Sequence, residues 1–125
     1  MGKGEVCKMK EFQRYFILIN NMSLRNDPSY VRVSLKDREG KTIRKIEENA
    51  LFSDKNFRDI SGLYIGLREA EHCGVKRIMV LTDNSFLGTI IKNGLGESYV
   101  DYYGFYYDIK RLMCNFEEVG VKVVA

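Results

Sequence analysis

Three polar residues of this 125-residue chain occupy positions where oxygen ligands could gather around a cation: Asn20, Asp59 and Asp83. Asn20 follows the apolar run YFILI, Asp83 follows the apolar run RIMVLT, and Asp59 lies near the start of a predicted helix. The ends of two neighbouring strands and the helix that covers them should bring these side chains to one spot. If their oxygen atoms lie within about 5 Å of one another, they could share one Mg²⁺ or Mn²⁺ ion.

Each of these residues also has a purely structural explanation. Asp83 could cap a helix that starts at Asn84, because a side-chain oxygen before a helix accepts hydrogen bonds from its first backbone N–H groups. Asp59 could be a first-turn carboxylate that the helix dipole favours. Asn20, together with Asn21, could simply terminate a strand. The metal hypothesis therefore depends on whether the three side chains converge.

Hydrophobic patterning predicts the elements that would position them. Apolar runs and period-two alternation predict five strands, at residues 15–19, 30–35, 42–46, 77–82 and 121–124. Apolar residues at intervals of three and four predict three helices, at residues 57–73, 84–93 and 109–118. Gly74 and Gly94 are expected to end the first two helices. Three antiparallel strands followed by two strands reached through helices indicate an α/β fold, with a mixed five-stranded sheet and helices on its faces.

Composition indicates one ordered domain. Hydrophobic residues make up 45% and charged residues 30% of the chain, which is typical of a folded globular protein. We expect residues 12–125 to form a single domain and residues 1–11 to be a flexible N-terminus. No apolar run approaches the length of a membrane span, so we expect no membrane association. Three widely spaced cysteines predict no disulfide framework and favour a reducing cytoplasmic or other intracellular compartment.

The charge and the aromatic residues permit contact with nucleic acid without requiring it. The net charge is +3, and basic residues are concentrated in the first third of the chain, where acidic neighbours dilute them. Aromatic residues crowd the segment 99–107, which could stack bases beside Lys110 and Arg111. The same segment could instead pack in the core or form an interface with a protein partner or a second copy of the chain.

Residues 66–94 carry a family resemblance. Their sequence, GLREAEHCGVKRIMVLTDNSFLGTIIKNG, resembles the plant and archaeal type of ribonuclease H domain, which shows G-L-x-x-A, a glycine, an apolar strand, an aspartate and a short apolar helix in this order. A weaker similarity lies where Asn20 is followed by the turn Asn26, Asp27 and Pro28. The resemblance implies a ribonuclease H-like fold.

The resemblance also assigns roles to the three polar residues. Asp83 matches the metal-binding aspartate that ends the fourth strand, and Asp59 matches the helix carboxylate, which is usually a glutamate. Asn20 stands where the family has its first-strand aspartate. We further expect the family's last helix, with its fourth acidic residue and the preceding catalytic histidine, to be lacking. Two carboxylates and a neutral amide would compensate the charge of metal ions poorly, so we expect weak affinity for Mg²⁺ or Mn²⁺.

Three functions follow from these expectations. The first is a degenerate ribonuclease H-like domain that binds nucleic acid or a protein partner with little or no cleavage. The second is an active Mg²⁺-dependent ribonuclease H that acts on RNA/DNA hybrids, with Asp59, Asp83 and Asn20 as its catalytic and metal-binding residues. The third is a noncatalytic assembly module or a ribosomal-protein-like RNA-binding module.

Overall fold

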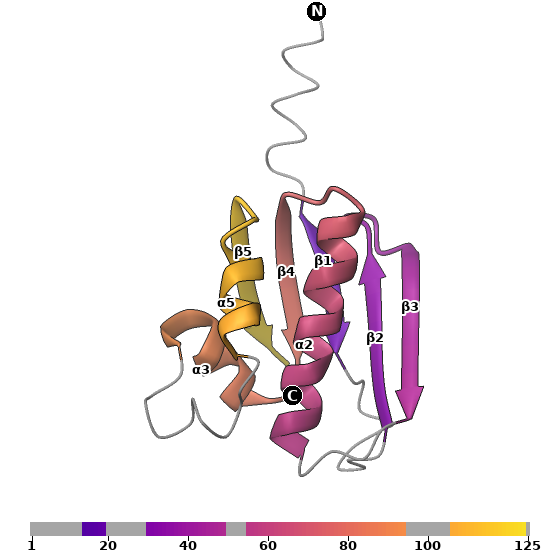
Figure 1. Cartoon of the computed structure of the whole chain (residues 1–125). Helices are drawn as coiled ribbons and strands as arrows, with labels where there is room; N and C mark the ends of the chain where they lie inside the picture. The colour runs from indigo at the N-terminus through magenta and orange to yellow at the C-terminus, as the bar shows by residue number, and fades with distance from the viewer. Residues whose placement is uncertain (1–13, 20–29, 50–54, 95–105, 125) are drawn as a thin grey trace, which may run out of the picture.

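The computed structural model describes residues 14–19, 30–49, 55–94 and 106–124. Within these ranges the chain forms five strands and three helices (Figure 1). In chain order the elements are β1 (Tyr15–Ile19), β2 (Tyr30–Lys36), β3 (Thr42–Asn49), α2 (Lys55–His72), β4 (Arg77–Thr82), α3 (Ser85–Asn93), α5 (Tyr106–Met113) and β5 (Glu118–Val123). The predicted boundary between residues 11 and 12 lies outside the described residues.

The strands form one mixed sheet in the order β3-β2-β1-β4-β5. β1 pairs antiparallel with β2, and β2 pairs antiparallel with β3. On the other side, β1 pairs parallel with β4, and β4 pairs parallel with β5. The predicted α/β architecture, with three antiparallel strands followed by two parallel ones, is confirmed. Because consecutive side chains of a strand point to opposite faces, this pairing places alternate apolar residues of neighbouring strands on a shared face.

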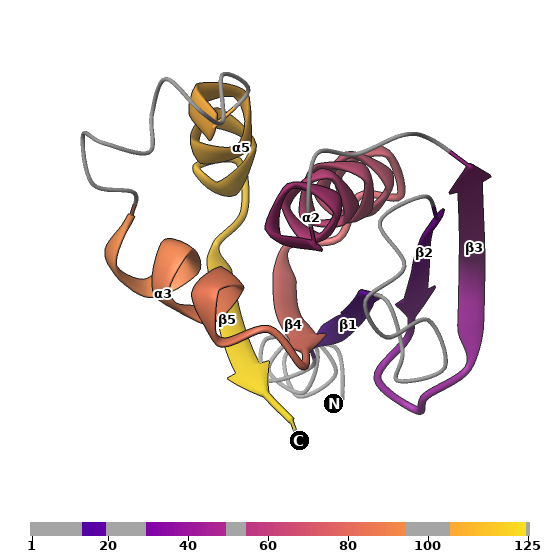
Figure 2. The ribbon, with the colours of Figure 1, turned by 90° about the horizontal axis from the view of Figure 1, so that it is seen from below.

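The helices cover that shared face. Ile17 of β1 lies between Leu35 of β2 and Val80 of β4, and all three side chains are buried. They belong to one apolar cluster with residues of all three described helices, for example Leu63 of α2 and Ile109 of α5. α2 lies over β1 and β2, α5 lies beside α2, and α3 packs against β5 (Figure 2). None of the described helices combines the length and apolar character needed to cross a membrane.

Two glycines let α2 approach the sheet closely. A Cβ atom added at Gly66 would lie 2.6 Å from Cγ2 of Ile17, and one added at Gly62 would lie 2.8 Å from Cγ2 of Ile19. Asp59 precedes Gly62 by three residues and therefore shares the sheet-facing side of the helix. Asp59 thus lies on the side of α2 that faces the sheet, where its side chain is 0% exposed.

The largest departure from the predicted elements lies in the last part of the chain. The helix expected at residues 109–118 ends at Met113, and the strand expected to start at Val121 already starts at Glu118. The backbone N–H groups of Glu117 and Glu118 both donate to the Lys76 carbonyl, which draws this segment alongside β4. Pairing between segments far apart in sequence therefore overrides the local helical pattern. The prediction that Gly74 and Gly94 end the first two helices is confirmed, and their φ angles are 77° and 82°.

Candidate functional site

Asp59 lies inside the protein rather than on its surface. Its side chain is 0% exposed, and the guanidinium of Arg58, which is 1% exposed, lies beside it. Nε of Arg58 donates a hydrogen bond to Oδ1 of Asp59 over 3.1 Å. Nδ2 of Asn84 donates to Oδ2 of Asp59 over 2.8 Å. Both carboxylate oxygens of Asp59 are therefore engaged by nitrogen donors of the protein.

Asn84 connects the three elements that meet at this point. Its side-chain oxygen accepts a hydrogen bond from the backbone N–H of Phe86 and so caps α3. Its Nδ2 donates both to Asp59 and, over 3.0 Å, to Oδ1 of Asn56 in the first turn of α2. Its backbone N–H donates to the hydroxyl of Thr82 at the end of β4. Asp83, one of the candidate caps, does not cap this helix, because α3 begins at Ser85 and Asn84 occupies the capping position.

Asp83 has a different environment. Its side chain is 22% exposed, and its buried Oδ1 accepts no hydrogen bond within the described part of the chain. Nζ of Lys55, at the start of α2, lies 4.0 Å from this oxygen. Asp83 directly precedes Asn84, which holds Asp59, so the predicted carboxylate pair lies around one end of α2. Asn20 lies outside the described residues, and its predicted share in the site stays a prediction.

The donor set of this region can be compared with what a divalent metal needs. Mg²⁺ requires oxygen ligands in direct contact, at about 2.0–2.1 Å, and near-octahedral geometry. At Asp59 an ion would share the two oxygens with the donors of Arg58 and Asn84, and at Asp83 it would meet the Lys55 ammonium. Across the described ranges, no three His, Cys, Asp or Glu side chains gather in a way that could hold a metal ion. The described side chains alone do not fit a two-metal centre.

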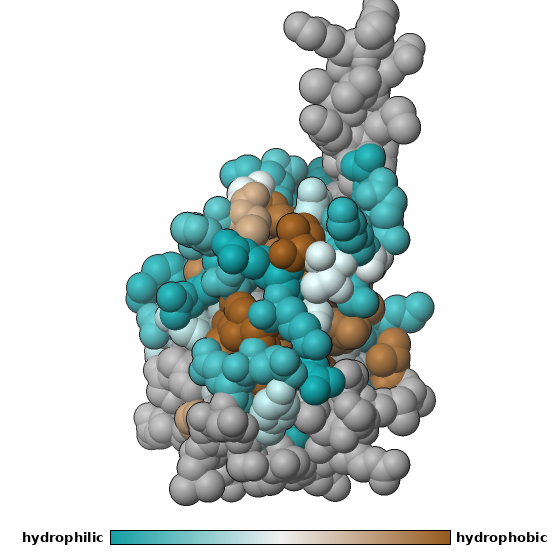
Figure 3. Space-filling model, turned by 90° about the vertical axis from the view of Figure 1, so that its right-hand side faces the viewer, coloured by the Kyte–Doolittle hydropathy of each residue, from teal (hydrophilic) through white to brown (hydrophobic). Residues whose placement is uncertain are grey.

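The arginines of the β2–β3 hairpin are paired with acids. Nε of Arg32 lies 2.8 Å from Glu47, and Nε of Arg44 lies 3.5 Å from Glu69 of α2. Hydrogen bonds from Tyr30 and Arg32 lower the pKa of Glu47 below its ordinary value. The face of the molecule that carries β3 is mainly hydrophilic, with a few apolar side chains between the polar ones (Figure 3). The acidic residues thus offset much of the positive charge that the sequence concentrates here.

The aromatic segment is described only at its end. Tyr106 is buried at 5% exposure, and Tyr107 is 58% exposed. Their ring centroids are 5.8 Å apart. Tyr106 therefore belongs to the core, in line with the packing explanation of this segment. Residues 99–105 lie outside the described residues, so the predicted interface through residues 99–107 stays a prediction.

Comparison with known proteins gives matches in structure and none in sequence. The sequence matches no protein-family model and no curated protein. The structure matches the N-terminal RNase H domain of Rv2228c from Mycobacterium tuberculosis, solved as a fusion with maltose-binding protein, with a TM-score of 0.76 and 15% identity over 90% of this chain and 82% of that chain.

Two further structures agree with this match. RNase H1 from the halophilic archaeon Halobacterium salinarum NRC-1 has a TM-score of 0.71 and 13% identity, over 90% of this chain and 84% of that chain. LC11-RNase H1, isolated from compost by a metagenomic approach and solved in complex with an RNA/DNA hybrid, has a TM-score of 0.72 and 12% identity, over 89% of this chain and 85% of that chain. At these identities the likeness concerns the fold, and the fold expected from residues 66–94 is confirmed: the chain has a ribonuclease H-like fold.

Proposed function

We propose that this chain binds nucleic acid, with an RNA/DNA hybrid as the preferred class of ligand, and cleaves it little or not at all. The ribonuclease H-like fold supports the first part, since LC11-RNase H1, which has this fold, was solved in complex with an RNA/DNA hybrid. The burial of Asp59 supports the second part. Its two oxygens are occupied by Arg58 and Asn84, and it has 0% exposure.

Charge compensation is the physical reason for expecting little cleavage. A two-metal nuclease needs carboxylates whose negative charge is free to balance the ions. Here the Arg58 guanidinium lies 3.1 Å from Asp59, and the Lys55 ammonium lies 4.0 Å from Asp83. Each carboxylate therefore already has a cation beside it, and an incoming Mg²⁺ or Mn²⁺ would be repelled by that cation. Weak metal affinity follows, while binding of a phosphate backbone does not require a metal.

Binding and cleavage can be measured on the same labelled duplexes. Fluorescence anisotropy would compare an RNA/DNA hybrid with RNA and DNA duplexes of equal length and sequence, at several salt concentrations. Gel electrophoresis would follow cleavage of the hybrid in Mg²⁺ and in Mn²⁺. We expect the hybrid to bind most tightly, with an affinity that falls as salt rises because phosphate contacts release counterions. We expect little cleavage in either metal.

The matched variant is Asp83→Asn, which removes one charge at nearly constant shape. The proposal predicts the same small amount of cleavage in the wild type and in this variant. Robust cleavage by the wild type that disappears in Asp83→Asn would overturn it. Failure of the hybrid to bind at low salt would refute the binding half.

A second candidate is an active metal-dependent ribonuclease H. The observation that favours it is the unbonded Oδ1 of Asp83, which is one oxygen that an ion could take within the described part of the chain. For this candidate, Asn20→Asp should strengthen Mg²⁺ binding, because it restores a negative charge where the resembling family has aspartate. Titration calorimetry of the wild type and of Asn20→Asp tests this. An unchanged affinity for Mg²⁺ would count against an active metal site.

A further inference from the structure

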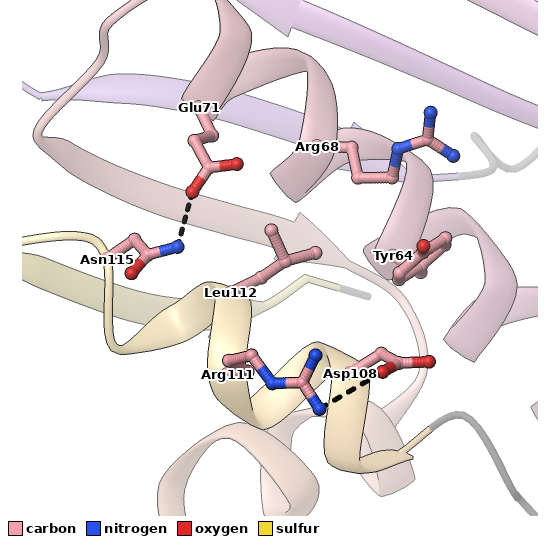
Figure 4. A pocket seen from close by; sticks show the side chains of 7 residues that line it. All are labelled: Tyr64, Arg68, Glu71, Asp108, Arg111, Leu112 and Asn115. Carbon is pink, nitrogen blue, oxygen red and sulfur yellow. Dashed lines mark hydrogen bonds and ion pairs between the residues drawn. The ribbon is translucent and has the colours of Figure 1, made fainter.

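A pocket of about 340 Å³ lies between α2 and α5, on the helical side of the molecule (Figure 4). Tyr64 and Arg68 line it from α2, and Arg111 and Leu112 line it from α5. Ligand pockets of proteins typically measure about 300–1,000 Å³. This one therefore suits a ligand the size of a single nucleotide. We call it the α2–α5 pocket.

The acidic groups of the α2–α5 pocket are already engaged. Glu71 accepts a hydrogen bond from the side-chain amide of Asn115 at one end of the pocket (Figure 4). Asp108 lies 3.6 Å from a guanidinium nitrogen of Arg111, one turn further along α5. Arg111 is 76% exposed and Asp108 is 50% exposed. An ion pair this exposed contributes little to stability, so Arg111 can turn to a phosphate at small cost.

Arg68 is the second cation that lines the pocket. Within the described residues, no carboxylate lies within ion-pair distance of its guanidinium. Instead the guanidinium lies 5.5 Å from the centroid of the Tyr64 ring. The Leu112 side chain, which packs against the core, extends between the two helices (Figure 4). An aromatic face and an apolar side chain beside exposed arginines are the groups with which proteins hold a base and its phosphate.

We propose that the α2–α5 pocket binds one nucleotide of a single strand, with the base against Tyr64 and Leu112 and the phosphate on Arg68 and Arg111. The pocket lies close to the candidate site along the same helix. Tyr64 follows Asp59 by five residues, which is a rise of about 7.5 Å along α2 and a rotation of about 140° around its axis. A strand that extends beyond the end of a bound duplex could therefore reach it. This inference deepens the proposed function, because it rests on nucleic-acid binding by the same domain.

A hybrid with a short single-stranded overhang tests the inference against a blunt hybrid of the same duplex sequence. We expect the wild type to bind the hybrid with the overhang more tightly than the blunt one. Arg68→Ala and Arg111→Ala should each weaken binding of the overhang hybrid about tenfold, because each removes a charge-assisted contact to phosphate. Neither variant should change the affinity for the blunt hybrid by a comparable factor. Lys92→Ala is the matched control, since Lys92 of α3 is exposed, carries the same charge and does not line the pocket.

Tyr64→Leu removes the ring while keeping apolar bulk, and it should weaken binding of the overhang hybrid about fivefold or more. Equal affinities of the wild type for the two hybrids, or equal losses in Lys92→Ala and Arg68→Ala, would overturn the inference. A short oligonucleotide alone separates the two proposals. The oligonucleotide could bind to the wild type but not to Arg68→Ala, while the blunt hybrid does not bind at all. This result would support nucleotide binding in the pocket and refute the proposed binding of hybrids.

Discussion

Replacing Gly66 with alanine would push a methyl group into the contact between α2 and β1. The added Cβ would lie 2.6 Å from Cγ2 of Ile17 and 3.1 Å from Cγ1 of Val33. Both partners are core side chains, with 0% and 2% exposure. Neither can move aside without disturbing its own neighbours, so α2 or the sheet must shift.

Two opposing terms set the size of the effect. Alanine is favoured over glycine inside a helix by about 1 kcal/mol. Inserting a methyl group into a packed core costs about 1–3 kcal/mol. The net change for Gly66→Ala is therefore a loss of up to about 2 kcal/mol in the free energy of unfolding.

Gly88→Ala in α3 is a matched comparison, since it brings the same gain in helix propensity. A Cβ atom at Gly88 would lie 2.9 Å from Cγ2 of Val123, but Val123 is 45% exposed and can rotate away. We therefore expect Gly88→Ala to keep the full gain in helix propensity and to stabilise the fold by about 1 kcal/mol. The difference between the two variants should be about 1–3 kcal/mol, which is the cost of overpacking alone.

Urea denaturation followed by circular dichroism measures both variants against the wild type. The midpoint for Gly66→Ala should fall while the slope stays constant, because the surface exposed on unfolding does not change. If Gly66→Ala unfolds at the same urea concentration as Gly88→Ala, α2 does not approach β1 as closely as described. The positioning of Asp59 against the sheet would then lose its basis.

Two further predictions concern individual charges. Asp59→Asn should lower the free energy of unfolding by about 3 kcal/mol or more, because it breaks the buried pair with Arg58, whereas the exposed Asp108→Asn should change it by less than about 0.5 kcal/mol. Equal urea midpoints for these variants would refute a structural role of Asp59. At the sheet edge, Arg14 donates two hydrogen bonds to Glu118 and holds the pKa of that carboxyl below its ordinary value. The contribution to stability is present above the ordinary glutamate pKa and is lost as the pH falls through the lower pKa of the folded state. An NMR titration should show the pKa of Glu118 rising in Arg14→Ala, and an unchanged value would contradict this.

Features of the fold that depend on local sequence patterns could be predicted from the sequence. The five strands, their mixed arrangement and the glycine stops at Gly74 and Gly94 follow from apolar runs and turn chemistry, and they are confirmed. The start of β5 could not be predicted, because it depends on hydrogen bonds from Glu117 and Glu118 to the distant Lys76. Local helical periodicity after Tyr106 gave no sign of that pairing.

The sequence predicted which residues form the candidate site, but it did not predict the hydrogen bonds between them. The similarity to ribonuclease H domains singled out Asp59 and Asp83, and both lie at one end of α2. Neighbouring residues of a helix normally point in different directions, so nothing in the sequence indicated that Arg58 would turn back onto Asp59. Which residue of the segment T-D-N-S caps α3 could not be predicted, since several of its side chains are able to cap a helix and the pattern does not rank them.

The strand order also constrains how the protein can fold. β2 and β3 are joined by a tight turn and can pair early, because closing a short loop costs little entropy. β1 pairs with β4 through Ile17 and Val80, which lie 63 residues apart, and this contact joins the antiparallel and parallel halves of the sheet. Contacts of such long sequence separation form slowly. Until β4 pairs with β1, the backbone N–H and C=O groups along one edge of β1 are unpaired. A partly folded chain would associate with a second copy most readily through this edge.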